Sequence, residues 1–236
     1  MNQPDILILA NTIDPEEARV AIVENGRLSE LFIERMWECQ KSGEIYKARV
    51  ESVLPGMNAA FVGLGDGRNG FLYLNDARGV KVQQNGEVLV QVVKTARKNK
   101  GARVTARISL PGRYLVLVPG GRDVGVSKRI VKEEERMRLK ETIRSLDTVG
   151  YGVILRTASE GVDADALADD LKRLKKLWRD IEDSAAKQTA PCLLYKDMGL
   201  VGRVLRDELS SEVSQIVVDN QEEYDRVADY LERYRA

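Results

Sequence analysis

The sequence contains no histidine, and this absence is the most restrictive feature of its composition. Histidine is the usual general base near neutral pH and the commonest metal ligand in proteins, so histidine-dependent hydrolysis is excluded. Cysteine is almost as scarce. Cys39 and Cys192 are far apart in the sequence and give neither a disulfide framework nor the paired spacing of a zinc site, so we expect both to be ordinary thiols.

Long apolar runs are also missing from the sequence. No segment approaches the roughly 18 consecutive apolar residues that span a bilayer, and the start of the chain lacks the features of a secretory signal. We therefore expect a cytoplasmic protein with no membrane span. With 236 residues, 43% of them hydrophobic, the chain is long enough to form packed cores.

Charge is balanced over the whole chain but unevenly distributed along it. Lysine plus arginine equals aspartate plus glutamate, at 37 each. The segment 88–122 nevertheless has eight basic residues and no acidic one, whereas 207–236 has nine acidic residues and three arginines. A local basic stretch on a neutral protein is typical of a phosphate-binding surface.

Short strands punctuated by glycine dominate the first half of the sequence. A buried strand is predicted at 6–10, and a hairpin closed by the turn signal Asn25-Gly26 follows it. Further strands are predicted at 45–54, 58–62, 70–74, 87–93, 102–108 and 114–118. Five or so short strands in about 70 residues favour a small closed barrel of the OB type over a sandwich.

Helical spacing of apolar residues begins after residue 118. Leu139, Ile143 and Leu146 indicate one helix, and a longer helix at 164–185 should bury Trp178 in the core. The tail is predicted to form a helix, a strand and a helix. Neither the N-terminal hairpin nor this tail can bury a core alone, so we expect them to pack together as one discontinuous domain.

Two aromatic residues on neighbouring predicted strands form the first candidate site. Phe61 and Phe71 precede a basic loop that contains Lys98 and Lys100. Bases stack on such rings while lysines follow the phosphate backbone of a single strand. The alternative is that both phenylalanines are barrel core and the lysines belong to a solvated loop.

A second candidate site begins at Arg156 and Thr157, at the end of an apolar strand. A guanidinium donates a planar fork of hydrogen bonds to a terminal phosphate, and a hydroxyl adds one more donor. The alternative is a strand-end arginine in a salt bridge followed by a helix-capping threonine. The segment Ser127-Lys128-Arg129 is a weaker candidate, for which a solvated basic turn is the default interpretation.

A series of short motifs, taken in order along the chain, resembles the ribonuclease E/G family. The motifs are Ala10-Asn11, 17–23 (EARVAIV), 45–50 (IYKARV), 59–62 (AAFV), 70–72 (GFL), 99–101 (NKG), 108–116 (ISLPGRYLV) and 155–158 (LRTA). No single motif is specific, but the ordered series extends over essentially the whole chain. Lys128-Arg129 and Gly63-Leu64 depart from the family's usual pattern, which has an arginine pair at the first and an acid with a larger residue at the second.

The resemblance implies an α+β fold. A five-stranded OB-type β-barrel (37–112) and an α/β 5′-sensor subdomain (113–195) would be inserted into a discontinuous RNase H-like α/β subdomain (1–36 and 196–236), whose second part we expect to be truncated. By the same resemblance, Phe61, Phe71 and Lys100 match residues that hold single-stranded RNA, and Gly112, Val116, Arg156 and Thr157 match the 5′-monophosphate pocket. Lys98, Lys128 and Arg129 are additional candidate RNA contacts.

The resemblance also implies a function. The family cuts single-stranded RNA in RNA processing and mRNA decay as a magnesium-dependent hydrolase, and it prefers 5′-monophosphorylated ends. Its catalytic aspartates lie in a DNase I-like domain, and its subunits are linked by zinc-binding cysteines; this chain matches neither part. We therefore expect no catalytic residue, magnesium or zinc here, and a homo-oligomer only for a full-length protein.

Three hypotheses remain open from the sequence. The chain is either a piece of such an endoribonuclease or a stand-alone, non-catalytic module that binds single-stranded RNA, and a barrel protein with no RNA role is the third hypothesis. The RNase H-like part is not expected to cut, because its first strand at 6–10 carries no carboxylate. Asp219 is its best lone acidic candidate, and we expect it to be structural.

Overall fold

The computed structural model describes residues 5–35, 41–77, 79–96, 100–210 and 212–234. In it, a strand near the N-terminus pairs with a strand near the C-terminus. Strand β1 (Ile6–Asn11) lies parallel to β14 (Val213–Val218). Strands β2 (Glu17–Glu24) and β3 (Arg27–Arg35) extend this sheet in the order β14-β1-β2-β3. The β2–β3 turn has positive φ at both Asn25 and Gly26, as its sequence predicts.

One face of this sheet is covered by α3 (Leu200–Glu208) and α4 (Gln221–Tyr234). Ile8 and Val20 from the sheet share a core with Leu205 from α3 and Tyr230 from α4. Segments 1–40 and 198–236 form one compact unit, and 41–197 forms the other. The predicted discontinuous α/β subdomain is therefore confirmed.

A closed barrel begins the second unit. Its strands are β4 (Ile45–Leu54), β5 (Ala59–Gly63), β6 (Asn69–Tyr73), β7 (Glu87–Lys94) and β8 (Arg103–Thr105), with 3-10 helices η2 (Pro55–Met57) and η3 (Leu74–Ala77) after β4 and β6. Their order is β4-β5-β6-β8-β7, and pairing of β7 with β4 closes the barrel. Pairing is antiparallel except between β6 and β8. The predicted five-stranded OB-type barrel is confirmed.

Two details of the barrel differ from the prediction. Strand β8 covers three residues of the expected 102–108, because Ala106 donates its N–H to the carbonyl of Asp76 and Arg107 donates to the Thr105 hydroxyl. These bonds turn the chain out of the ladder. A strand that the sequence did not predict, β13 (Cys192–Tyr195), pairs with β4 on the outside of the closed ring.

A second, smaller sheet follows the barrel. It contains β9 (Leu110–Pro111), β10 (Leu115–Pro119), β11 (Val124–Val126) and β12 (Tyr151–Leu155) in the order β11-β12-β10-β9. Helices α1 (Glu133–Ser145) and α2 (Ala164–Lys187) pack against it, with η4 (Thr157–Ser159) between β12 and α2. We call β9 to β12 the small sheet.

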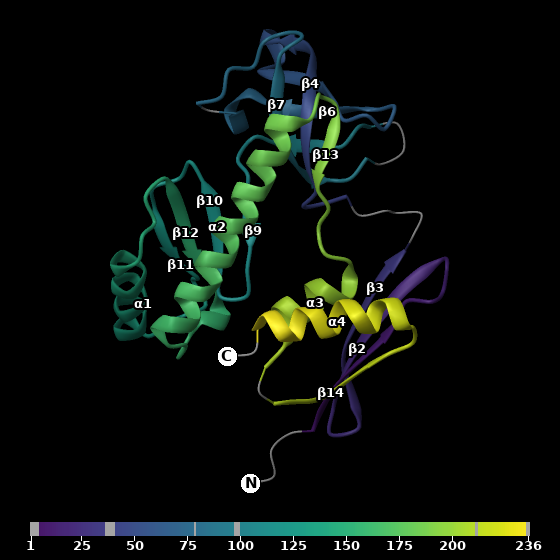
Figure 1. Ribbon diagram of the computed structural model, residues 1–236, viewed down its shortest axis with the longest axis vertical. Helices are drawn as coiled ribbons and strands as arrows, with labels where there is room; N and C mark the ends of the chain where they lie inside the picture. The colour runs from purple at the N-terminus through teal and green to yellow at the C-terminus, as the bar shows by residue number, and fades with distance from the viewer. Residues whose placement is uncertain (1–4, 36–40, 78, 97–99, 211, 235–236) are drawn as a thin grey trace. The chain divides into compact units, whose positions relative to one another are not determined.

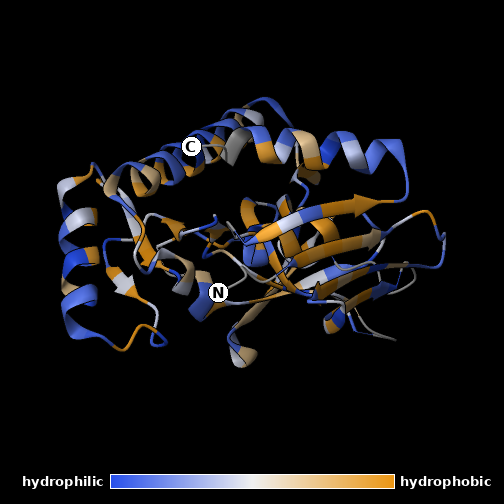
Figure 2. Ribbon diagram, turned by 90° about the horizontal axis from the view of Figure 1, so that it is seen from below, coloured by the Kyte–Doolittle hydropathy of each residue, from blue (hydrophilic) through white to orange (hydrophobic). Residues whose placement is uncertain are grey.

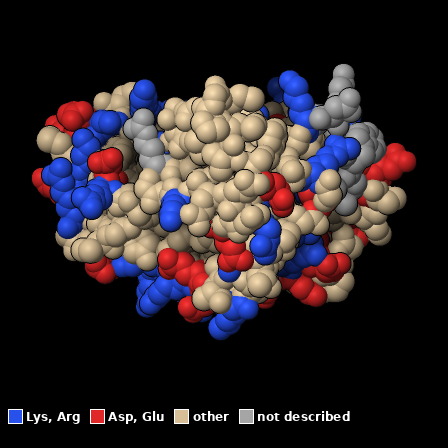
Figure 3. Space-filling model, turned by 90° about the horizontal axis from the view of Figure 1, so that it is seen from above, with Lys and Arg blue, Asp and Glu red and all other residues tan. Residues whose placement is uncertain are grey.

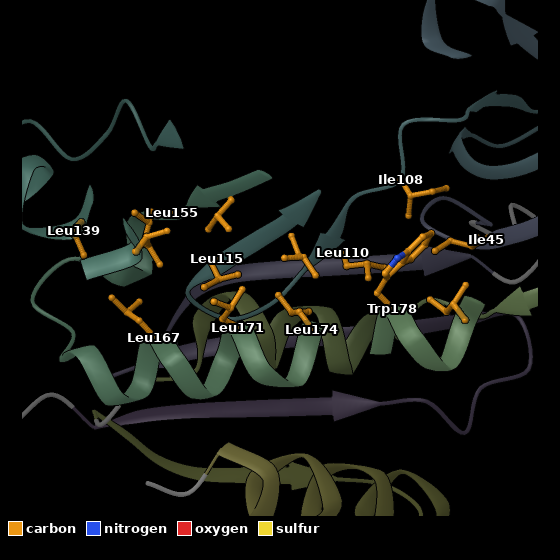
Figure 4. Packing of buried hydrophobic residues seen from close by; sticks show 14 of the residues in the cluster. Ile45, Ile108, Leu110, Leu115, Leu139, Leu155, Leu167, Leu171, Leu174 and Trp178 are labelled. Carbon is orange, nitrogen blue, oxygen red and sulfur yellow. The ribbon is translucent and has the colours of Figure 1, made fainter. Parts of the chain in front are cut away.

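Helix α2 joins the small sheet to the barrel, as the long green helix in Figure 1 shows. Its buried side chains form the stripe that the helical spacing predicts, and Figure 4 shows Leu171, Leu174 and Trp178 directed toward Leu115, Leu110 and Ile45. Trp178 is only 8% exposed, which confirms its predicted core position. Burying each large apolar side chain contributes about 1.5–3 kcal/mol. In Figure 2 the strands are coloured mostly as apolar, whereas polar and apolar residues alternate along the helices.

The end of α2 is fastened to the barrel by Lys47 of β4. Its ammonium donates to the carbonyls of Ala185 and Gln188, at 3.0 and 2.8 Å, and pairs with Glu87 at 2.8 Å. A cation that satisfies the last carbonyls of a helix also interacts favourably with its dipole. The barrel and the small sheet are thereby held together within one unit.

Across the described residues, no helix is long and apolar enough to cross a membrane.

Candidate nucleic-acid interface

Phe61 and Phe71 lie side by side on the outer surface of the barrel. They are directly paired across β5 and β6, with ring centroids 5.7 Å apart and ring planes at 74°. Side chains alternate between the two faces of a strand, and the neighbouring Val62 and Leu72 fill the interior with no exposed surface. Both rings are partly exposed. The interpretation of these rings as sealed barrel core is therefore wrong.

A third ring continues this aromatic surface and was not singled out from the sequence. Tyr73 is two residues beyond Phe71 on β6, lies 4.8 Å from it between centroids and is 40% exposed. The Arg103 guanidinium lies 5.0 Å from the centre of the Tyr73 ring and forms an ion pair with Asp76 at 3.4 Å. The spacing of two residues from Phe71 was the signal that would have identified Tyr73.

Lys100 is exposed at the start of the segment that leads into β8. The next residue, Gly101, lies so close to β6 that a Cβ there would be 1.9 Å from the carbonyl oxygen of Asn69. This close approach lets the carbonyl of Ala102 accept a 2.7 Å hydrogen bond from the N–H of Phe71. The backbone that follows Lys100 is therefore held against β6, while Lys98 lies outside the described residues.

Arg156 and Gly112, which are far apart in sequence, meet at one end of the small sheet. Antiparallel pairing of β10 with β12 places the start of one strand beside the end of the other. The Arg156 guanidinium donates to the carbonyl of Gly112 at 2.7 Å and to that of Arg113 at 3.4 Å. These contacts fix the guanidinium against the loop that contains Gly112.

The same loop is held from below by Asp170 of α2, a buried carboxylate with no exposed surface. Its Oδ2 accepts hydrogen bonds from the N–H groups of Tyr114 and Leu115, at 2.9 and 3.2 Å. Burial raises the pKa of Asp170, and the hydrogen bonds from these backbone N–H groups only partly oppose it. Asp170 was not singled out from the sequence. The signal that could have identified it is an acidic residue on the apolar stripe of α2, three residues after Leu167.

Thr157 lies beside the basic turn at 127–129. Its hydroxyl is 3.0 Å from that of Ser127, whose N–H donates to the carbonyl of Leu155. Arg136 of α1 supports the turn by donating to the carbonyls of Ser127 and Ile130. Lys128 and Arg129 are exposed on it. The ends of β11 and β12 therefore bring together this turn and the residues Gly112, Arg156 and Thr157.

Val116 lies next to this group on the outer face of the small sheet. Its neighbours in the sequence, Leu115 and Leu117, point into the core, and its partner across the strands is Ile154, which is 45% exposed. The side chain of Val116 is therefore apolar surface on the face opposite α2. The structure brings together all four residues predicted for the phosphate pocket, with Val116 at its margin.

The loop that follows Thr157 is tied to helix α1 by Glu135. This carboxylate accepts two hydrogen bonds of 2.7 Å from Arg138 and one of 2.9 Å from the N–H of Gly161. The bonds from Arg138 and Gly161 hold the pKa of Glu135 at about 2, below its ordinary value of 4.5. Figure 3 shows basic and acidic side chains interspersed over one face of the molecule, so positive charge is not continuous on that face.

The described residues do not offer a metal site. They contain no group of three or more His, Cys, Asp or Glu side chains that could hold an ion. The carboxylate of Asp219 accepts hydrogen bonds from Asn11, Thr12, Ile13 and Asn220. Burial acts to raise the pKa of Asp219, but these donors lower it overall. Asp219 fastens β14 to the end of β1, in agreement with the structural role predicted for it.

Comparison with known proteins gives consistent matches. Residues 109–236, more than half of the chain, match the family described as Ribonuclease E/G family. Ribonuclease G of Escherichia coli K12 is 38% identical over 241 residues, which cover 94% of this chain and 49% of that protein. Ribonuclease E of Synechocystis sp. is 42% identical over 192 residues, with 76% and 28% covered. Ribonuclease G of Haemophilus influenzae is 36% identical over 250 residues, with 98% and 51% covered. The chain spans about half the length of these ribonuclease G relatives.

Proposed function

We propose, since the chain belongs to the ribonuclease E/G family, that it binds single-stranded RNA on the barrel and recognises a 5′-monophosphate beside the small sheet. The observation that carries the proposal is the position of Phe61 and Phe71 on the outside of the barrel, with the backbone that follows the exposed Lys100 held against β6. In OB barrels, the face of the second and third strands and the loop between the fourth and fifth strands are where oligonucleotides bind. The two rings and the lysine occupy these positions.

The angle between the rings favours a single strand over a duplex. Neighbouring bases in a duplex are parallel, whereas bases stacked on Phe61 and Phe71 would be inclined by the 74° between the ring planes. Only an unpaired strand can splay its bases in this way. Each stacked base contributes about 1–3 kcal/mol without regard to its identity, and nearby cations add a salt-dependent attraction to phosphate.

A terminal monophosphate suits the residues around Arg156. It carries about 1.5–2 negative charges near pH 7 and accepts several hydrogen bonds. Arg156, Thr157 and the cationic turn with Lys128 and Arg129 offer a planar fork, a hydroxyl and two further positive charges. A pocket built on the Gly112 loop, with Val116 at its margin, would reject a triphosphate by its bulk.

In this proposal the chain supplies substrate capture to a single-strand-specific endoribonuclease of cytoplasmic RNA processing and mRNA decay. Cleavage would be carried out by parts of the longer relatives that this chain does not match. The described residues contain no cluster of three or more His, Cys, Asp or Glu side chains, and no cleavage step is assigned to them. A stand-alone RNA-binding or regulatory module is the second candidate, and it is supported by the same lack of a metal site among those residues.

A titration at fixed salt concentration tests binding to the barrel. Phe61→Ala combined with Phe71→Ala should weaken the binding of a single-stranded oligonucleotide by at least about 5-fold, the effect of losing one stacked base. Tyr224→Ala removes an aromatic residue that is 58% exposed on α4 and is the matched control. Equal affinity of the double variant and the wild type would reject binding on this face.

A second titration tests the phosphate pocket. Arg156→Lys keeps the positive charge but loses the planar fork, so the preference for 5′-monophosphorylated over 5′-hydroxyl RNA should fall while generic binding stays. Arg144→Lys, at an exposed position of α1, is the control. Equal losses on both ligands would count against a sensor. Incubating the chain with magnesium and single-stranded RNA completes the test, because robust cleavage would overturn a capture-only role.

A further inference from the structure

A third planar surface adjoins the two phenylalanine rings. From the positions of Tyr73 and Arg103 we infer a third base-binding position, so that the barrel holds at least three consecutive nucleotides of a single strand. The inference rests on the proposed function and deepens it. It extends the RNA-binding surface in a defined direction, from β5 across β6 to β8.

Tyr73 is positioned to continue the stacking surface. Residues two apart on a strand project from the same face, so Tyr73 lies beside Phe71 on the outside of the barrel. The two ring centroids are 4.8 Å apart, with planes at 82°. Tyr73 is 40% exposed, and a base that stacks there would again be inclined to the base on Phe71. The same splayed geometry therefore continues for one more step.

Arg103 completes the position because its plane is already supported. The guanidinium lies over the Tyr73 ring, 5.0 Å from its centre, and Asp76 binds it at 3.4 Å, while 44% of the arginine side chain remains exposed. Bases stack on guanidinium planes as they do on aromatic rings. A side chain that is already held loses less conformational freedom when a base binds it.

Strand register places positive charge along the same direction. Arg103 is the direct partner of Phe71 across β6 and β8, and Lys94 of β7 is the partner of Arg103. The row Phe61, Phe71, Arg103 and Lys94 therefore crosses four neighbouring strands. Lys94 and Arg103 are both exposed. They can contact the phosphates of a strand whose bases occupy the three stacking positions.

The competing explanation is that Arg103, Asp76 and Tyr73 only brace η3 against β8. If these residues only brace η3, substituting them should change the stability of the protein, and no change in RNA affinity should depend on the length of the RNA. A third base position predicts the reverse pattern, because a ligand too short to reach it cannot sense its loss. The two explanations therefore differ in a measurable way.

The experiment measures the affinity of the full 236-residue chain for oligouridylates of two to six nucleotides at one salt concentration. In the wild type, affinity should rise when the ligand becomes long enough to reach Tyr73. Tyr73→Ala should remove that rise, by about 5- to 150-fold for the loss of one stacked base, and leave the shortest ligand unaffected. Tyr73→Phe should retain it, because the ring is what stacks.

Variants of the arginine separate stacking from charge. Arg103→Lys keeps the positive charge near Asp76 but removes the plane, so it should also reduce affinity for the longer ligands only. Arg107→Lys is the matched control, because Arg107 is an exposed arginine four residues further along that donates to the carbonyl of Asn75. Thermal unfolding of each variant shows whether the fold is retained.

The results also distinguish this inference from the proposed function. If Phe61→Ala weakens every ligand while Tyr73→Ala and Arg103→Lys bind all lengths like the wild type, the third position is wrong and barrel binding stands. If Phe61→Ala and Phe71→Ala have no effect at any length, the proposed function itself fails. If Tyr73→Ala unfolds, Arg103→Lys and Tyr73→Phe still decide the question.

Discussion

The carboxylate of Asp170 occupies the space that a side chain at position 112 would need. A Cβ placed on Gly112 would lie 2.5 Å from Oδ2 of Asp170, which is fixed by the N–H groups of Tyr114 and Leu115. The carbonyl of the same glycine accepts the hydrogen bond from Arg156. A glycine is required here by the packing of α2 beneath the loop, and the loop in turn positions the arginine.

Substituting Gly112 with alanine should therefore displace this loop. Overpacking a well-filled site costs about 1–3 kcal/mol in the free energy of unfolding, and we expect Gly112→Ala to fall in this range when measured by denaturant titration. Gly125→Ala in the same sheet is the control, because its Cβ would make only ordinary contact with Ile154, at 3.6 Å. Equal stability of the two variants would contradict the packing argument.

Asp170 itself should make stability depend on pH in an unusual direction. Because burial raises its pKa, the folded protein holds this proton more tightly than the unfolded chain. The resulting stability is fully present below the unfolded pKa of about 4 and is lost as pH rises through the folded pKa. Asp170→Asn keeps an oxygen acceptor and removes the titration, so its stability should vary less with pH across this window.

The comparison with Asp170→Ala tests the hydrogen bonds. Alanine leaves the N–H groups of Tyr114 and Leu115 without their acceptor, and each unsatisfied group costs about 1–3 kcal/mol. Asp170→Ala should therefore be clearly less stable than Asp170→Asn at every pH. Unfolding curves of the two variants that coincide would show that the backbone groups find other partners.

Glu135 should give the opposite pH dependence. Its hydrogen bonds from Arg138 and Gly161 hold its pKa at about 2, so the folded state favours the ionised form. This stability is present above the unfolded pKa of 4.5 and is lost as pH falls toward 2. Glu135→Gln should lower stability near neutral pH and reduce the difference from the wild type in acid. Acid-induced unfolding monitored by circular dichroism checks this, and a constant difference at all pH values would contradict it.

The placement of the aromatic residues shows how far local pattern extends. The sequence predicted strands at β5 and β6, with Phe61 and Phe71 on neighbouring strands. The alternation of these rings with smaller apolar residues along each strand was enough for this prediction. Tyr73 was missed although it has the same alternation, because the prediction relied on a motif that ended at Leu72. The ion pair of Arg103 with Asp76 could not be predicted, since it depends on η3 turning back toward β8.

The residues predicted to bind a 5′-phosphate show the limit set by long-range packing. The sequence predicted that Arg156 and Gly112 belong to one site only through the family resemblance, because 44 residues separate them. What joins them is the pairing of β10 with β12 and the buried Asp170 beneath. A salt bridge was the alternative for Arg156; the contacts to the carbonyls of Gly112 and Arg113 depend on loop geometry that apolar periodicity does not encode.

Gly101 offers the most direct test of how the barrel backbone supports RNA binding. A Cβ at this position would lie 1.9 Å from the carbonyl oxygen of Asn69, so Gly101→Ala must push the start of β8 away from β6. The hydrogen bond from the Phe71 N–H to the Ala102 carbonyl would weaken, and Lys100 would move away from β6. We expect lower thermal stability together with weaker binding of single-stranded RNA and a smaller dependence of affinity on salt concentration.

Gly56→Ala is the matched control for this change, because a Cβ on Gly56 in η2 meets no atom within 4 Å. It should leave both stability and affinity close to those of the wild type. Lys100→Gln separates the two consequences, since it removes the charge without disturbing the backbone and should weaken binding with little effect on unfolding. If Gly101→Ala is destabilised but binds RNA as tightly as the wild type, Lys100 does not contact the phosphate backbone. The binding surface would then consist of the aromatic rings, Arg103 and Lys94.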